Sequence, residues 1–182
     1  MKGLTCVLVA SVMAVSCAQT PPEPEGPEYH AYADLARMMQ AIPFPASNII
    51  FDAGIEDPEV ALKKAEAESG GAPSYAAVYG GWTEVENAAL ALQETANLLK
   101  VPGRLCRNGK PVPNDQEDFK MFTDRLADAG MAAYRAAQAK DVDALGVDVG
   151  GAVSDACAAC HEVYRDFDDE SMRCIVREAA AE

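Results

Sequence analysis

The sequence predicts an all-α protein, an antiparallel four-helix bundle with one extra short connecting helix. Apolar residues recur at spacings of three and four along four long segments, which is the pattern of amphipathic helices. No segment shows the strict alternation of apolar and polar residues that predicts a strand. Pro and Gly gather in short connections between these segments, and four helices joined in this way pack best as an antiparallel bundle.

The N-terminal half contains the first long helix and the connecting helix. We expect the first helix to begin near residue 28 and to be kinked or interrupted by Pro43 and Pro45 before residues 48–53. Its apolar residues share one stripe: Tyr32, Leu35, Met39 and Ile42. The acidic and lysine-containing stretch 58–68 predicts the connecting helix, because a Gly- and Pro-containing run follows it at once.

Three more long helices follow. The second extends over 82–99 and ends before Pro102, and its apolar stripe consists of Trp82, Val85, Ala89, Leu92, Ala96 and Leu99. The third begins after a cap at Asn114 or Asp115, and its core-facing residues are Phe119, Phe122, Leu126, Ala129 and Ala133. The fourth runs over about 148–167 and carries on or near one face Val149, Val153, Ala156, Cys160, Tyr164 and Phe167.

The N-terminus predicts export. Residues 1–16 have the charged start, short apolar core and small-residue end of a secretory signal peptide. Cys17 follows Ala-Val-Ser in a pattern that resembles a bacterial lipobox, so we expect lipidation of Cys17; ordinary cleavage after Ala18 is the alternative. The Pro- and Glu-rich residues 17–28 predict an extended tether, and residues 29–182 predict the folded domain. The expected location is the periplasmic side of a bacterial membrane, lipid-anchored, or the periplasm itself under the alternative.

The run from Cys157 to His161 is the part of the sequence that says most about function. Its C-x-x-C-H spacing is the mark of covalent c-type haem attachment, in which two thiols add to the vinyl groups of one haem and the imidazole coordinates its iron. A zinc site would need further ligands in close pairs, and a dithiol redox site would follow a strand. Neither pattern is present in the sequence. We therefore expect one covalent haem c, with Cys157 and Cys160 as its thioether residues and His161 as the proximal iron ligand.

The motif continues to Tyr164 and Arg165 as C-x-x-C-H-x-x-Y-R on the last predicted helix, and in this it resembles the cytochrome c′ group of class II c-type cytochromes. The resemblance covers roughly residues 28–170. It implies a four-helix bundle that binds haem, with His161 below the iron and Arg165 near the haem on the same side. The helix 58–68, the break at Pro43 and the extra cysteines depart from the simplest pattern of this family.

The sixth iron position separates two functions within this family. In electron-transfer relatives a Met from the first helix caps the iron, whereas in cytochrome c′ proper an apolar side chain blocks that face. Helical periodicity places Met39, rather than Met38, on the stripe with Leu35, so Met39 is the candidate distal ligand and Leu35 the distal neighbour. Core packing or steric cover of the haem is the alternative role of Met39. His30 is the other histidine of the chain, but it lies on the opposite side of this helix from Met39 and is therefore a poor candidate for an iron ligand. The remaining predicted haem surroundings are Phe119, Phe122 and Tyr164.

Two cysteines remain outside the motif and the signal region. An oxidising compartment permits Cys106 and Cys174 to pair. In an up-down-up-down bundle, the loop between the second and third helices lies at the same end as the C-terminus of the fourth. A disulfide between Cys106 and Cys174 is therefore predicted, with two unpaired thiols as the alternative.

Composition limits the partners. A net charge of −14 makes nucleic acid an unsuitable partner, and it suits a basic redox partner, although acidity also serves solubility alone. We expect a monohaem cytochrome that transfers electrons and is not an enzyme, since no acid or base is placed for substrate chemistry. The first alternative is a five-coordinate protein that binds nitric oxide or carbon monoxide; the second is a non-haem metal or disulfide protein. The membrane, through Cys17, and a second copy of the chain in a homodimer are the other candidate partners.

Overall fold

The computed structural model describes residues 29–70 and 78–176 of the 182-residue chain. These two ranges are mostly helical, and they contain no strand beyond an isolated bridge between Leu105 and Pro111. The prediction of an all-α protein is confirmed. The predicted signal peptide, the tether and Cys17 lie outside the described residues. None of the described helices combines the length and the apolar character needed to cross a membrane.

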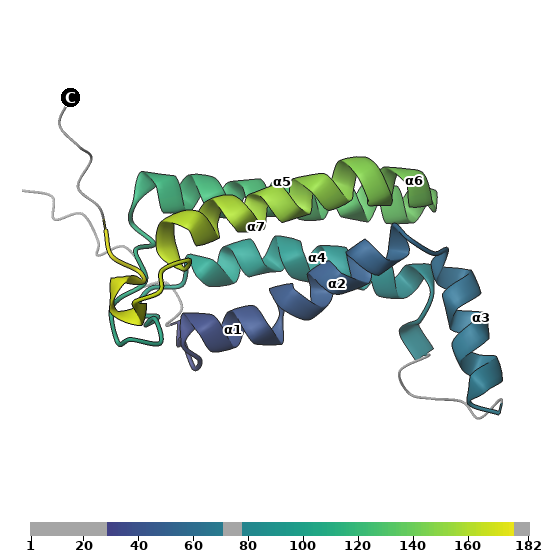
Figure 1. The fold of residues 1–182 in the computed structure, drawn as a ribbon, viewed down its shortest axis with the longest axis horizontal. Helices are drawn as coiled ribbons and strands as arrows, with labels where there is room; N and C mark the ends of the chain where they lie inside the picture. The colour runs from purple at the N-terminus through teal and green to yellow at the C-terminus, as the bar shows by residue number, and fades with distance from the viewer. Residues whose placement is uncertain (1–28, 71–77, 177–182) are drawn as a thin grey trace, which may run out of the picture.

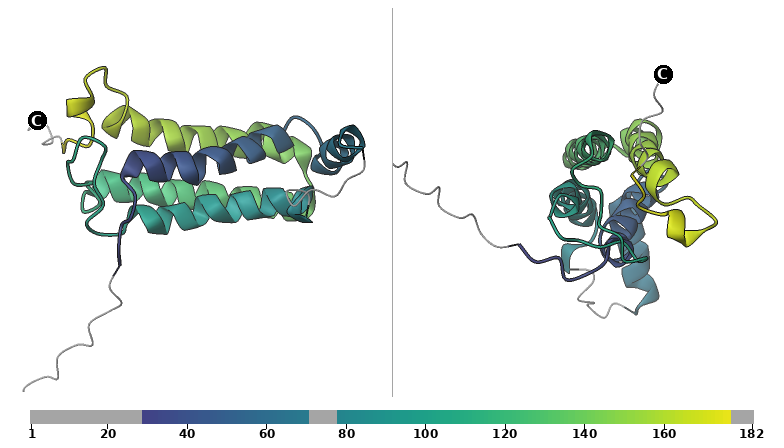
Figure 2. Two further views of the ribbon diagram at one scale, coloured as in Figure 1. Left: turned by 90° about the horizontal axis from the view of Figure 1, so that it is seen from below. Right: turned by 90° about the vertical axis from the view of Figure 1, so that its left-hand side faces the viewer.

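Four helices, labelled α2, α4, α5 and α7, run side by side, and each points in the opposite direction to the one before it (Figure 1). In chain order the helices are α1 (Leu35–Ala41), α2 (Pro43–Ala53), α3 (Pro58–Glu68), α4 (Trp82–Leu99), α5 (Glu117–Ala139), α6 (Val142–Ala144), the π-helical turn η2 (Leu145–Val149), α7 (Gly150–Tyr164) and the 3₁₀ turn η3 (Glu170–Met172). The short helix α3 projects at the end opposite to η3, and the end-on view in Figure 2 shows α2, α4, α5 and α7 grouped around one core.

The first helix begins later than the sequence predicts. Asp34 is its N-cap, and the Asp34 carboxylate accepts a hydrogen bond of 2.8 Å from the backbone N–H of Arg37. The backbone N–H of Leu35 donates to the carbonyl oxygen of Leu105 at 2.8 Å, which ties this helix start to a distant loop. The start predicted near residue 28 is therefore wrong, and so is the place of Tyr32 on the apolar stripe, because Tyr32 is 94% exposed.

Pro43 interrupts the helix for a single residue. The ring of a proline crowds the preceding residue, and Ile42 accordingly leaves the helical region with φ −122° and ψ −70°. Pro43 then opens α2 at a first-turn position, where a missing N–H costs no intrahelical hydrogen bond. The helix resumes at once and includes Pro45, so residues 43–53 form one helix rather than the shorter 48–53 segment.

The helices α4 and α5 carry the predicted apolar stripes into the core. Buried residues on them include Trp82, Val85, Leu92, Leu99, Phe119, Phe122, Leu126, Ala129 and Ala133. The predicted cap of α5 is wrong by one or two positions, because Gln116 rather than Asn114 or Asp115 is the N-cap. The Asn114 amide instead donates to the carbonyl oxygens of Lys100 and Val101, and it thereby fastens the loop between α4 and α5.

The last helical segment starts earlier and ends earlier than the predicted 148–167. It is helical from Val142, passes through η2 and ends at Tyr164. The carbonyl oxygen of His161 accepts from the backbone N–H groups of both Arg165 and Asp166 at 2.8 Å, which closes the helix and turns the chain. Gly146, Gly150 and Gly151 all lie within this segment, and Gly146 packs directly against the backbone of Gly54 at the end of α2.

Candidate functional site

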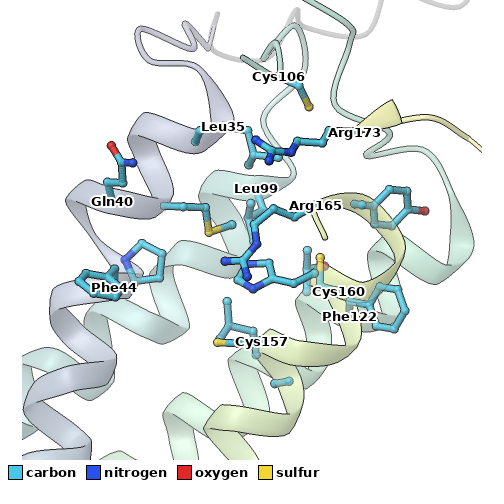
Figure 3. Close-up of a pocket in the computed structure, with 18 of the residues that line it drawn as sticks. Leu35, Gln40, Phe44, Leu99, Cys106, Phe122, Cys157, Cys160, Arg165 and Arg173 are labelled. Carbon is cyan, nitrogen blue, oxygen red and sulfur yellow. The ribbon is translucent and has the colours of Figure 1, made fainter. Parts of the chain in front are cut away.

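A cavity of about 460 Å³ lies at the end of the molecule where α1 begins and α7 ends (Figure 3). This volume falls within the range of roughly 300–1,000 Å³ that ligand pockets occupy. Side chains of α1 and α2 form one wall, and side chains of α5 and α7 form the other. Every residue predicted to surround or hold the haem lines it: Leu35, Met39, Phe119, Phe122, Cys157, Cys160, His161, Tyr164 and Arg165.

The α7 wall brings the three motif side chains to one face. Cys160 and His161 follow Cys157 by three and four residues, so both lie one helical turn from Cys157 on the same side of the helix, and all three are partly buried. Cys157 and Cys160 carry free thiols. Burial raises the pKa of Cys157, and burial followed by the neighbouring Cys157 raises the pKa of Cys160 to about 12. Both sulfurs are therefore protonated at neutral pH in the chain as described.

The imidazole of His161 is held neutral. Its pKa is lowered first by burial and then by the charge of Arg165, with Asp166 acting weakly in the opposite direction. A neutral imidazole has one ring nitrogen with a free lone pair, which is the form that binds a metal. The position of His161 next to Cys160 thus offers a nitrogen ligand directly beside the two thiols.

The opposite wall contains Met39. Met38 is 4% exposed in the core, whereas Met39 is partly buried and lines the cavity together with Leu35. Helical periodicity thus identifies the methionine that reaches the cavity, but coordination of iron by Met39 stays a prediction. His30 is not among the residues that line the cavity.

The part of this wall that α2 supplies was not predicted from the sequence. Pro43, Phe44 and Phe51 line the cavity. Phe44 and Phe51 are seven residues apart, so they lie on one helix face with Ser47 between them, and all three line the cavity. This periodicity is present in the sequence, but the kink or interruption predicted at Pro43 and Pro45 hid it.

Tyr164 joins the two helices of the second wall. Its hydroxyl donates to a carboxylate oxygen of Asp118 at 2.6 Å, and the same oxygen accepts from the backbone N–H of Phe119 at 2.8 Å. Its ring meets the rings of Phe119 and Phe122 edge-to-face, with centroids 5.5 and 6.4 Å apart. Burial, followed by the hydrogen bond to Asp118, raises the pKa of Tyr164, so this phenol remains a neutral donor.

A disulfide closes one end of the cavity. Cys106 and Cys174 are bonded, with their Cα atoms 6.5 Å apart, in the pairing that the sequence predicts. The backbone N–H of Cys174 donates to the carbonyl oxygen of Tyr164 at 3.0 Å, so the chain returns to the end of α7. The neighbouring residues Arg107 and Arg173 also line the cavity, and neither was predicted from the sequence. Their positions in the sequence could have identified them, because Arg107 directly follows Cys106 and Arg173 directly precedes Cys174.

The residues present fit a haem better than a bare metal ion. Two free thiols, a neutral imidazole and a thioether sulfur meet in one cavity with aromatic walls, and these are the side chains that bind haem c and its iron. In the described part of the chain, no group of three or more His, Cys, Asp or Glu side chains could hold a metal ion by itself. No protein-family model matches this chain, and comparisons with curated proteins and with solved structures return no match either.

Proposed function

We propose that this protein is a monohaem c-type cytochrome that transfers electrons, built as a four-helix bundle of the cytochrome c′ type. The observation that carries the proposal is the convergence of Cys157, Cys160, His161 and Met39 on one cavity. The side-by-side arrangement of α2, α4, α5 and α7 supports the bundle (Figure 2). A fold of this kind presents cofactors between facing helices, which is where the cavity lies.

The chain's own residues would hold and shield the cofactor. Each thiol would add across one vinyl group, with its S–H hydrogen passing to the second carbon, so that two thioether bonds join α7 to the ring. His161 would bind the iron through its unprotonated ring nitrogen, and Met39 would approach from the α1 wall. A haem bound in this way supplies a one-electron iron couple. The aromatic side chains of Phe119, Phe122 and Tyr164 would exclude water from it.

A five-coordinate protein that binds nitric oxide or carbon monoxide is the second candidate. The observation in its favour is the apolar cover that Leu35, Pro43 and Phe44 place on the same wall as Met39. In this function Met39 would act as steric cover over the iron rather than as its ligand.

Two neighbouring methionines provide a matched test. The change Met39→Leu alters the cavity wall, whereas Met38→Leu makes the same substitution in the core. We expect the wild-type protein to retain haem on a denaturing gel and to show, when reduced, a low-spin spectrum that carbon monoxide does not change. Met39→Leu should turn the spectrum high-spin and sensitive to carbon monoxide, and Met38→Leu should leave it low-spin.

Two other results would contradict electron transfer. A wild-type spectrum that is high-spin and shifts with carbon monoxide would favour the gas-binding protein. Loss of the haem stain on the denaturing gel would reject both cytochrome functions and leave a non-haem metal or disulfide protein.

The location and partners follow from the same proposal. A lipid on Cys17 and the tether 17–28 would hold the domain at the periplasmic side of a membrane. A basic redox partner would meet the exposed acids that follow α7, Asp166, Asp168, Asp169 and Glu170. Three of these carboxylates are already engaged within the chain, by Arg165, by the backbone of Ser171 and by Arg173. This engagement favours a solvated surface over an acidic docking face.

A further inference from the structure

The charge of the cavity is opposite to that of the protein. The chain carries a net charge of −14. The formally charged side chains that line the cavity are three arginines and one glutamate, so the cavity carries a net charge of +2 with His161 neutral: Arg107, Arg165, Arg173 and Glu170. An acidic protein that gathers arginines around one cavity is suited to bind an anion there.

Arg173 has unused hydrogen-bonding capacity in this cavity. Its Nη1 donates to a carboxylate oxygen of Glu170 at 2.7 Å, but its Nε is buried and has no acceptor. Buried N–H groups of proteins are almost always paired, so this one indicates a partner in the functional state. Arg104 has a similar buried Nε, but Arg104 lies outside the cavity and is anchored by the carbonyl oxygens of Ala33 and Leu98.

The disulfide holds two of these arginines at one end of the cavity. Arg107 directly follows Cys106, and Arg173 directly precedes Cys174, so the bond between the cysteines brings the two arginines together. The amide of Asn108 adds hydrogen bonds of 2.9 Å to the carbonyl oxygens of Glu170 and Arg173. The backbones of these two residues are thus held near each other by a covalent bond and by hydrogen bonds, and both side chains line the cavity.

The positions of these arginines match the shape of haem. Figure 3 shows Arg173 and Cys157 at opposite ends of the cavity, with Arg165 between them. A haem carries its vinyl groups and its two propionate carboxylates on opposite edges of the ring. An attachment at Cys157 and Cys160 would therefore direct the carboxylate edge away from α7 and toward the end that the disulfide closes. Guanidinium groups suit this role, because their planar N–H groups can bind both oxygens of a carboxylate.

We propose that Arg107 and Arg173 form a carboxylate-binding subsite for the haem propionates, and that the Cys106–Cys174 disulfide holds this subsite in place. The subsite rests on the proposed haem function, and it gives the disulfide a role in the site as well as in stability. Arg165 lies between the two ends (Figure 3), and its charge acts on Cys157, Cys160 and His161.

The test uses full-length protein that carries its haem. The variants are Arg107→Gln and Arg173→Gln, and Arg135→Gln is the matched control, because Arg135 is an exposed residue of α5 that does not line the cavity. The measurement is the midpoint potential of the haem as a function of pH. Protonation of a propionate removes a negative charge from beside the iron and thereby stabilises the reduced state. The midpoint potential therefore rises in the pH range where the propionate is protonated.

We expect the arginines to keep the propionates ionised down to low pH. In Arg173→Gln and Arg107→Gln, the rise in potential on acidification should begin at a pH higher by about 1 or more than in the wild type, as is usual on loss of a close opposite charge. Arg173→Lys should restore most of the wild-type profile, and Arg135→Gln should reproduce it. The double change Cys106→Ser and Cys174→Ser should shift the profile in the same direction as Arg173→Gln with both arginines retained.

Each contrary result has a distinct meaning. Profiles of Arg107→Gln and Arg173→Gln that coincide with that of Arg135→Gln would overturn the subsite while the haem stain upholds the cytochrome. A shift in the arginine variants without one in the double cysteine variant would overturn only the role of the disulfide. A wild-type protein without haem stain would instead reject the proposed function, and this result is read from the gel before any potential is measured.

Discussion

At the scale of single residues, Tyr164 links the chemistry of α7 to the packing of α5. It is one helical turn beyond Cys160, it is buried, and its hydroxyl donates to Asp118 at the start of α5. Its ring also packs against Phe119 and Phe122. A side chain held on both its polar and its apolar parts has little rotational freedom, so Tyr164 fixes the cavity wall beside the motif.

Removal of the Tyr164 hydroxyl tests this link. Tyr164→Phe keeps the ring but removes the hydrogen bond to a charged acceptor, so we expect the free energy of unfolding to fall by about 2 kcal/mol in urea denaturation. Tyr134→Phe is the matched control, because the Tyr134 hydroxyl meets only the amide of Gln138 in an exposed pair at 3.1 Å. Equal small losses in both variants would contradict a special role for the pair of Tyr164 and Asp118.

At the scale of helices, close approach of backbones decides how α4 and α5 pack. Gly130 of α5 faces α4, and a Cβ atom there would lie 2.9 Å from the backbone nitrogen of Gln93 and 3.0 Å from the carbonyl oxygen of Ala89. These are backbone atoms, so only movement of the helices could make room. By contrast, a Cβ atom at Gly151 of α7 would meet nothing within 4 Å.

The two glycines therefore give opposite predictions for the same substitution. Gly130→Ala should lower the free energy of unfolding by about 1–3 kcal/mol, since an added methyl group overpacks the contact between α4 and α5. Gly151→Ala should raise it by about 1 kcal/mol, because Ala has the higher helix propensity and nothing opposes its side chain. Thermal unfolding of both variants measures the difference, and stabilisation by Gly130→Ala would show that α4 and α5 can separate without cost.

Helix boundaries show how far local pattern can be trusted at this scale. The stripes of α4 and α5 were predicted correctly, because a period of about 3.6 residues depends only on the helix itself. The start of α1 was not, since it depends on the contact of Leu35 with Leu105 in a loop far along the chain. The end of α7 likewise depends on His161, whose carbonyl oxygen accepts two backbone N–H groups where the chain turns. Pro43 misled the prediction of α2, because a proline in the first turn is compatible with a helix.

At the scale of the whole molecule, one disulfide joins parts of the chain 68 residues apart. It connects the loop after α4 to the segment after α7, and it closes the cavity where the two segments meet. Hydrogen bonds from Asn108 and Lys110 to the carbonyl oxygens of residues 170–173 reinforce the same junction. The end of the molecule that contains the candidate site is thus cross-linked by the disulfide.

Loss of this bond should be visible as lost stability. In the chain-entropy model a closed loop of 68 residues contributes about 4 kcal/mol, so we expect the double change Cys106→Ser and Cys174→Ser to lower the free energy of unfolding by about that amount. A thiol reductant should destabilise the wild type to a similar degree and leave the double variant unchanged, because thioether bonds to haem are not reduced by thiols. An equal effect of the reductant on both proteins would contradict the prediction.

The sequence by itself determined the all-α class, the main helical stripes and the residues that α7 and α1 present to the cavity. These follow from local rules, because spacing along a helix decides that Cys157, Cys160 and His161 share a face and that Met39 joins Leu35. Only the tertiary structure decided that the α2 aromatics complete the wall and that Arg107 and Arg173, which flank the paired cysteines, both line the cavity. The physical reason is distance along the chain: such neighbours are brought together by packing and by a bond between remote segments, which no local period encodes.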